Sequence, residues 1–185
     1  MKTNRKHPVK KEIANALIKL MKDKPYSKIS ISEISENAKV SRISFYRNFK
    51  DKDDVIKYYF DGIITPFADE ISNVTSLMTV KEFYKAAFTT VEKRKDDFIL
   101  FYKNNLLSYY IMELQKACLK AFDKENNPED YYRCLVFNGS FTLVTFGWLF
   151  DNRKETPEEL AEIYEKILFS KDNYTAILLK SDLVK

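Results

Sequence analysis

Apolar residues recur at helical spacing along most of the chain. Over residues 9–22 the apolar side chains fall on one face and lysines on the opposite face, which predicts an amphipathic helix with one buried side. With only 3 Gly and 5 Pro among 185 residues, the chain has too few turn residues for a many-stranded β protein. The pattern therefore predicts an all-α fold, with further helices over 54–64, 67–74, 79–96, 98–104 and 108–125 and two more beginning at Pro128 and Thr156.

Two short helices follow the first amphipathic one. Ser30 stands three residues before Glu33, a spacing typical of a capping box at a helix start, and Ser41 can cap the second short helix. About four residues separate the two helices, and Phe45 and Phe49 share the inner side of the second. Two short helices braced by a longer one predict a helix-turn-helix.

Charge is unevenly distributed between the two ends of the chain. The net charge is +4, but residues 1–60 hold 15 Lys and Arg against 7 Asp and Glu, so the remaining residues carry an acidic excess. This asymmetry predicts a polyanion-binding segment attached to a body that does not bind polyanions.

Residues 134–150 form the longest stretch without any charge. The stretch is shorter than the ~20 residues of a membrane span, and polar residues and glycines interrupt it, so we expect no membrane partner. A helix that is apolar on every side must be buried on every side, which predicts a homodimer in which one face meets a second subunit. The expected interface comprises Gly139, Gly147, Leu160, Ile163, Tyr164 and Ile167.

Residues 30–54 resemble the DNA-binding domain of the tetracycline-repressor (TetR) family, most specifically in Ala38–Ser41 and in the run SFYRNFKDK over 44–52. The resemblance covers about residues 9–60. It implies an all-α protein with a three-helix helix-turn-helix DNA-binding domain at 1–54 and a helical effector-binding and dimerisation domain at 55–185. Two residues depart from the family pattern. Lys39 stands at the turn position that is usually Gly, and Ile43 stands at a position that usually holds a small residue.

The second short helix would then enter the major groove of a double-stranded DNA operator. Ser41 and Arg42 would face base edges, and Ile43 would either contact a thymine methyl group or only pack. Tyr46 is alternatively a half-buried core tyrosine, and Lys50 and Lys52 are alternatively solvated charges. The residues expected to contact phosphates are Ser44, Tyr46, Lys50, Lys52 and either Ser30 or Ser32.

The C-terminal half offers a weaker resemblance. Asn138-Gly139, residues 148–152 and residues 156–159 look like the TetR branch that includes the dihydroxyacetone-kinase operon regulator, in which the partner can be a protein instead of a small molecule. Aromatic stripes in this half either line a pocket or only form core; a ligand there should be apolar or aromatic, with few charges. The candidate ligand residues are Tyr84, Phe88, Phe101, Tyr102, Tyr109, Phe137, Phe141 and Trp148.

Nothing in the sequence predicts an enzyme. The only histidine, His7, lies in a basic tail, and glycine-rich phosphate loops and catalytic motifs are missing, so we expect neither a cofactor nor a metal. The polar N-terminus resembles no signal or transit peptide, which predicts a cytoplasmic protein. The leading hypothesis is a homodimeric TetR-type regulator, more often a repressor, that reads a palindrome under effector control. The alternative is a protein-partner adaptor that uses its C-terminal surface and binds DNA weakly or not at all.

Overall fold

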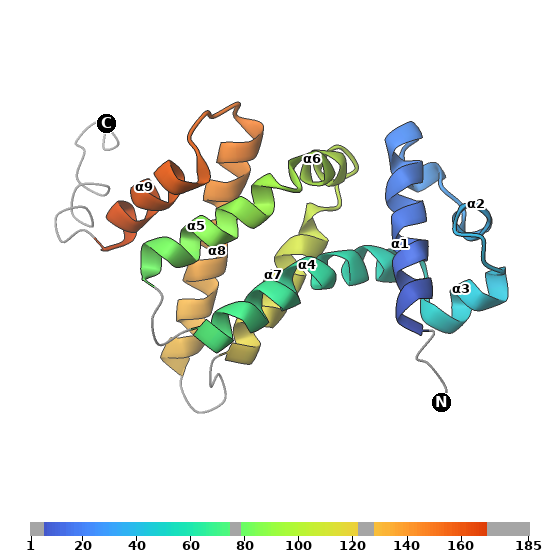
Figure 1. Cartoon of the computed structure of the whole chain (residues 1–185), viewed down its shortest axis with the longest axis horizontal. Helices are drawn as coiled ribbons and strands as arrows, with labels where there is room; N and C mark the ends of the chain where they lie inside the picture. The colour runs from blue at the N-terminus through green and yellow to red at the C-terminus, as the bar shows by residue number, and fades with distance from the viewer. Residues whose placement is uncertain (1–5, 75–78, 122–127, 170–185) are drawn as a thin grey trace.

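The structure is a computed structural model that describes residues 6–74, 79–121 and 128–169 (Figure 1). These residues form α-helices joined by short turns, with no strand among them, so the all-α prediction is confirmed. The helices are α1 (Lys6–Asp23), α2 (Ile31–Asn37), α3 (Arg42–Asn48), α4 (Lys52–Val74), α5 (Val80–Glu92), α6 (Lys95–Lys103), α7 (Leu107–Ala121), α8 (Pro128–Phe150) and α9 (Pro157–Phe169), with a 3₁₀ turn η1 (Tyr26–Lys28) after α1.

The helices form two parts, which α4 joins (Figure 1). The head consists of α1, α2 and α3, and α1 contacts the other two. The body consists of α5 to α9, with the later turns of α4 packed against α7. The proposed boundary at residue 54 falls within the first turn of α4, and no break separates the two parts there.

Side-chain caps begin several of these helices as the sequence predicts. At α2, the Ser30 hydroxyl accepts from the Glu33 amide while the Glu33 carboxylate accepts from the Ser30 amide. Thr79 and Glu82 repeat this arrangement at α5. Each such cap is worth about 1 kcal/mol, because it satisfies amide groups that the helix leaves unpaired. The capping boxes therefore fix where these helices begin.

Three local expectations are wrong. The helix expected over 79–96 ends at Glu92, and α6 starts at Lys95 after a turn through Arg94, whose backbone φ of −121° and ψ of 20° is not helical. The break lets α6 change direction and bring its phenylalanines into the core. Pro66 neither ends nor restarts α4. His7 lies in the first turn of α1 and not in a tail.

Two aromatic clusters hold the body together. The first surrounds Phe60 of α4, whose ring centroid lies 4.5 Å from that of Phe101 and 5.6 Å from that of Tyr110. The second joins α5, α8 and α9, where Tyr164 meets the Tyr84 ring edge-on at 4.4 Å. The indole of Trp148 lies against Phe88 in this second cluster and donates to the Glu155 carbonyl oxygen at 2.8 Å. The first cluster thus joins α4 to α6 and α7 and reaches α8 through Phe146, while the second joins α5, α8 and α9.

The turn of the helix-turn-helix contains a residue in the left-handed region. Lys39 has a φ of +54°, where a Cβ costs about 1 kcal/mol relative to glycine. We therefore expect Lys39→Gly to raise the free energy of unfolding or leave it unchanged, since glycine's greater freedom in the unfolded chain offsets part of the gain. Urea denaturation followed by circular dichroism measures this; Ser32→Gly, at an exposed helical position of α2, should lower stability. A clearly lower free energy of unfolding in Lys39→Gly would contradict backbone strain at this position.

Candidate functional site

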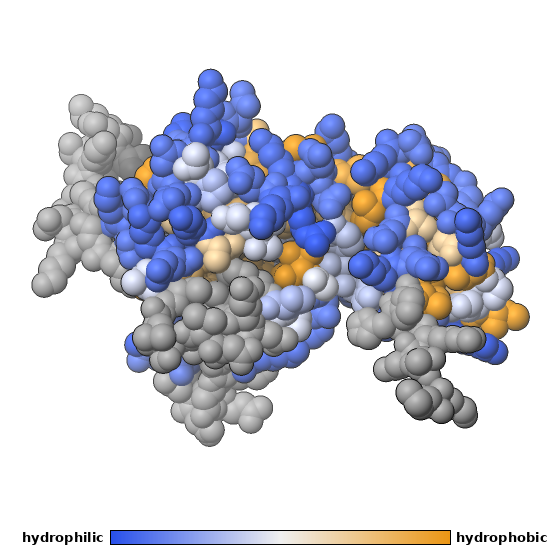
Figure 2. All heavy atoms as spheres, viewed as in Figure 1, coloured by the Kyte–Doolittle hydropathy of each residue, from blue (hydrophilic) through white to orange (hydrophobic). Residues whose placement is uncertain are grey.

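The outward face of α3 exposes large side chains, and apolar surface is visible at the end of the head where this helix lies (Figure 2). Phe45 and Phe49 anchor the helix from its inner side, and both are buried. Ile43 and Tyr46 point away from this core and are 67% and 52% exposed. Arg42, at the start of the helix, is exposed as well. A large apolar side chain, a guanidinium and a phenol thus lie together on one exposed helix. Tyr46 is therefore not a core tyrosine.

The start of α3 is built by Ser41. Its hydroxyl oxygen accepts from the Ser44 amide at 3.0 Å, which leaves the Ser41 hydroxyl proton free to donate outward. The Ser44 side chain is half-buried one turn further on. The cap holds Arg42 at the first helical position, where its side chain projects from the end of the helix. The sequence therefore places Ser41, Arg42, Ile43, Ser44 and Tyr46 on one short helix with its outer face open.

The start of α2 is more crowded than the sequence indicates. Both the amide and the hydroxyl of Ser30 donate to the Glu33 carboxylate, at 2.9 and 2.8 Å, and Lys24 pairs with the same carboxylate. These contacts lower the pKa of Glu33 to about 2, so the group stays ionised. A phosphate at this helix end would meet a carboxylate. Of the two serines expected there, Ser32 is exposed and has the freer hydroxyl.

The ammonium group of Lys52 has partners within the protein, although the sequence analysis expects it to contact a phosphate. Its ammonium donates to the carbonyl oxygens of Tyr26 and Ile29, at 2.8 and 2.9 Å, and sits 4.4 Å from the centre of the Tyr26 ring. These contacts fasten the η1 turn to the start of α4. Lys50, two residues earlier, is exposed and remains suited to a phosphate. The structure therefore argues against Lys52 as a phosphate ligand and gives it an internal partner.

A polar junction joins the head to the body around Tyr26. The Tyr26 hydroxyl donates to the Asp53 carboxylate, and the Tyr26 amide donates to the side-chain oxygen of Asn104 at 2.8 Å. Tyr109 of α7 bonds to Asp53 from the body side, and burial together with this contact raises the pKa of Tyr109 to about 12. The hydrogen bonds with these tyrosines lower the pKa of Asp53. Tyr26 of η1 and Tyr109 of α7 thus meet at one ionised carboxylate of α4, and Asn104 of the α6–α7 turn holds the Tyr26 backbone.

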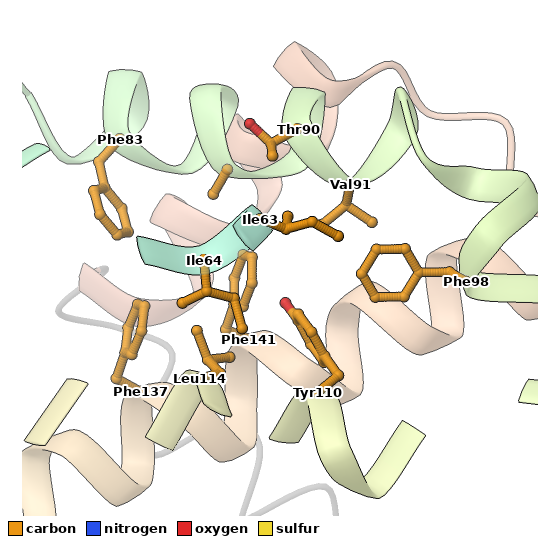
Figure 3. A pocket seen from close by; sticks show the side chains of 11 residues that line it. Ile63, Ile64, Phe83, Thr90, Val91, Phe98, Tyr110, Leu114, Phe137 and Phe141 are labelled. Atoms are coloured by element: carbon orange, nitrogen blue, oxygen red, sulfur yellow. The ribbon is translucent and has the colours of Figure 1, made fainter. Parts of the chain in front are cut away.

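A small cavity lies in the body between α4, α5, α6, α7 and α8 (Figure 3). Its volume is about 50 Å³, and its wall is almost entirely hydrocarbon. Thr90 and Tyr110 contribute the hydroxyl groups of the lining, and no charged residue takes part. The lining residues are Ile63, Ile64, Phe83, Ala87, Thr90, Val91, Phe98, Tyr110, Leu114, Phe137 and Phe141.

Only two of the eight predicted ligand residues, Phe137 and Phe141, line this cavity. The other six lie elsewhere, because helical spacing alone does not distinguish a cavity wall from a packed interior. Tyr102 is exposed and stacks on Phe150, and Tyr109 lies at the junction. Four are core residues, namely Tyr84, Phe88, Phe101 and Trp148. The sequence analysis missed the wall residues of α4, Ile63 and Ile64, an apolar pair at the end of the helix expected over 54–64.

An apolar stripe runs along the outside of α8. Val136 and Leu143 are 66% and 74% exposed, and Gly139 lies between them with nothing within 4 Å of where a Cβ would stand. Ile163 and Ile167 of α9 are also partly exposed.

The predicted interface needs one correction on α9. The structure buries Leu160 and Tyr164 inside the body, where the Tyr164 hydroxyl lies 2.6 Å from the Ser140 hydroxyl. These two side chains cannot meet a second subunit. Gly147 is half-exposed, with Asp151 nearby.

Among the described helices, α8 is long and apolar enough to cross a membrane by length and composition, with a mean hydropathy of 1.2. Its inner side is packed against the body through Cys134, Phe141 and Trp148, all of them buried. This is the packing of a core helix. Within the described ranges, no group of three or more His, Cys, Asp or Glu side chains could hold a metal ion.

The arrangement of α1, α2 and α3 is that of a helix-turn-helix domain with its second short helix exposed for contact with nucleic acid. Residues 13–59 match the family model described as bacterial regulatory proteins, tetR family. This match covers the head and the start of α4, and it confirms the resemblance found in the sequence.

Curated relatives of the chain are described as HTH-type transcriptional regulators. Over 117 residues, or 57% of this chain, the sequence is 27% identical to the HTH-type dhaKLM operon transcriptional activator DhaS of Lactococcus lactis. The matched parts span 45% to 62% of the curated relatives' own lengths. These relatives are transcriptional regulators and not enzymes, as the sequence analysis expects.

Solved structures share the fold over nearly the whole chain. The fatty acid degradation regulator FadR from Bacillus halodurans matches with a TM-score of 0.56 at 18% identity, over 87% of this chain and 98% of its own. FadR from Bacillus subtilis, solved in complex with stearoyl-CoA, matches with a TM-score of 0.54 at 17% identity, over 86% of this chain and 97% of its own. At these identities the likeness establishes the fold.

Proposed function

We propose that this protein is a TetR-type transcriptional regulator that binds a palindromic DNA operator as a homodimer under the control of an effector in its body. The exposed face of α3 carries this proposal. Its inner residues are buried against the head, while Arg42, Ile43 and Tyr46 are exposed. A helix held in this way fits the major groove, which is wide enough to admit it.

The three outward side chains divide between sequence reading and affinity. The Arg42 guanidinium would grip a guanine with two hydrogen bonds, and the exposed Ile43 side chain would meet a thymine methyl group. Tyr46, Ser44 and Lys50 would bind phosphate oxygens, which adds affinity without specificity. Ser41 supplies one more donor near the base edges.

Homodimer formation would use the stripe on α8 together with Ile163 and Ile167 of α9. A large apolar stripe rimmed by polar residues is typical of an interaction site. Gly139 would let the partner helix approach closely. Two copies related by a two-fold axis then place their α3 helices on half-sites about one turn of DNA, ~34 Å, apart.

Effector control is supported by the position of the cavity. Its volume of about 50 Å³ is well below the roughly 300–1,000 Å³ of ligand pockets, so side chains must move when a ligand enters. Helices α6 and α7 supply Phe98 and Tyr110 to the cavity wall. The same segment supplies Asn104, in the turn between these helices, and Tyr109 of α7 to the junction with the head. A displaced wall would therefore change the contacts that hold the head, and a small head rotation would mismatch the half-sites.

The apolar wall favours an effector with a hydrocarbon or aromatic body. The stearoyl-CoA complex of the Bacillus subtilis FadR structure supports this class. We propose that the protein acts as a repressor in the cytoplasm. DhaS is named an activator. Whether such a regulator represses or activates transcription depends on the position of its operator relative to the promoter.

The test is DNA binding by the purified protein and by Arg42→Ala, titrated against salt with the upstream region of its own gene and with a scrambled duplex. Wild type should bind its operator at nanomolar concentration, with a preference of ~10³ or more and a steep salt dependence. Arg42→Ala should lose about 10- to 100-fold in discrimination, since a bidentate contact with guanine is worth about 1–3 kcal/mol.

The matched control is Arg153→Ala, which removes an exposed arginine of the body that pairs with Glu155. It should leave both affinity and preference unchanged. Weak and equal binding of wild type to both duplexes would contradict the regulator and favour the adaptor hypothesis.

A further inference from the structure

The cavity has almost no polar chemistry of its own. Of its two hydroxyl-bearing residues, Thr90 has already used its proton, because its hydroxyl donates to the Ala86 carbonyl oxygen at 2.9 Å within α5. The remaining wall atoms belong to aliphatic and aromatic side chains, apart from Tyr110. The polar recognition that this wall can offer a ligand therefore rests on one hydroxyl group.

Tyr110 is buried, and its hydroxyl points into the middle of the cavity (Figure 3). No residue in the described part of the chain forms a hydrogen bond with it. Burial raises its pKa, so the hydroxyl keeps its proton and is a donor. Phe98 meets the ring edge-on at 5.0 Å, and Phe60 and Phe146 pack against it at 5.6 and 6.2 Å. Three aromatic neighbours thus hold an unused donor in a fixed direction.

The hydroxyl groups of the other buried tyrosines have hydrogen-bond partners. Tyr84 bonds to Tyr164, whose hydroxyl lies 2.6 Å from the Ser140 hydroxyl. The half-buried Tyr26 and Tyr59 donate to Asp53 and Asp97. The Tyr110 hydroxyl faces the cavity without such a partner among the described residues, and a donor left unpaired when an apolar ligand excludes water costs about 1–3 kcal/mol.

We propose that the Tyr110 hydroxyl donates a hydrogen bond to an acceptor atom of the effector, so that the cavity selects apolar molecules that carry a carbonyl group, such as ketones, esters or thioesters. The inference rests on the proposed function, in that an effector enters this cavity. A pure hydrocarbon of the same shape would fill the space and leave the hydroxyl unpaired. An acceptor at the right position removes that cost, which is how a site built around one polar group distinguishes ligands of equal size.

The test compares two small probes of nearly the same shape, acetophenone and ethylbenzene, because apolar protein cavities accept molecules of this kind. Binding to wild type and to Tyr110→Phe is measured by ligand-observed nuclear magnetic resonance. The substitution removes only the hydroxyl group. We expect acetophenone to bind Tyr110→Phe about three- to tenfold more weakly than wild type, while ethylbenzene binds both equally or prefers the variant slightly.

Tyr84→Phe is the control, since it removes a buried hydroxyl that bonds within the core and does not line the cavity. It should leave the ratio of the two affinities unchanged. In the absence of probe, the free energy of unfolding should be equal or higher in Tyr110→Phe and lower in Tyr84→Phe, because only Tyr84 has a hydrogen bond to lose.

Equal weakening of both probes, no acetophenone binding up to its solubility limit, or a clear destabilisation of unliganded Tyr110→Phe would each overturn the proposal. Operator binding by Tyr110→Phe without probe should match wild type. Loss of operator binding in wild type itself would instead contradict the proposed function, so the two failures are distinguishable.

Discussion

Replacing Leu143 by Asp should convert the protein to a monomer and weaken operator binding by at least about 100-fold. Leu143 is the most exposed side chain of the α8 stripe, at 74%, so the change leaves the core of the subunit intact. In a two-fold interface the substitution acts from both subunits at once, and each new carboxylate would be buried without a partner. A monomer binds one half-site alone and loses the gain from two linked contacts.

Sedimentation velocity on wild type and variant gives the oligomeric state, and titration with the operator gives the affinity. The matched control is Met112→Asp, which adds the same charge at an exposed apolar position of α7. Met112→Asp should remain dimeric with unchanged operator affinity. A dimeric Leu143→Asp would place the interface elsewhere on the body.

Phe60→Ala should lower the free energy of unfolding by about 3–5 kcal/mol, the usual cost of removing a buried phenylalanine. The Phe60 side chain has no exposed surface and contacts aromatic residues of α6 and α7, with ring centroids 4.5 to 6.1 Å away. These rings are themselves buried in a close-packed core, so we expect them to close only part of the cavity that the substitution leaves. A loss of this size is a large fraction of the stability of an ordinary domain.

Urea unfolding followed by circular dichroism measures the loss. Tyr102→Ala is the comparison, since Tyr102 is an exposed aromatic residue that stacks on Phe150. It should cost less than about 1 kcal/mol. A Phe60→Ala loss as small as that of Tyr102→Ala would mean that the body collapses readily around α4.

Features that depend on residues close together in the chain could be predicted from the sequence. Ser30 and Glu33 are three residues apart, so their reciprocal bonds follow from spacing alone. The inward position of Phe45 and Phe49 follows from the helical period, and the exposed face of α3 is its complement. The left-handed Lys39 could be expected as well, because the resemblance places a glycine there.

Features that depend on how helices meet could not be predicted. Lys52 looks like an exposed basic residue in the sequence, and only the return of η1 to the start of α4 gives it two carbonyl partners. On α9 both faces are apolar, so periodicity alone could not say that Leu160 and Tyr164 face the body while Ile163 and Ile167 do not. The cavity wall draws on five helices, and none of them marks it alone.

The position of Trp148 makes the two parts of the molecule spectroscopically separable. It is the only tryptophan in the chain, and it is buried in the body against Phe88, with its indole nitrogen bonded to the Glu155 carbonyl. Tryptophan emission therefore reports on the body and is blind to the head, whereas far-ultraviolet circular dichroism records the helices of both. A head that melts ahead of the body would show as an ellipticity change without any shift in emission, in the unlabelled wild-type protein.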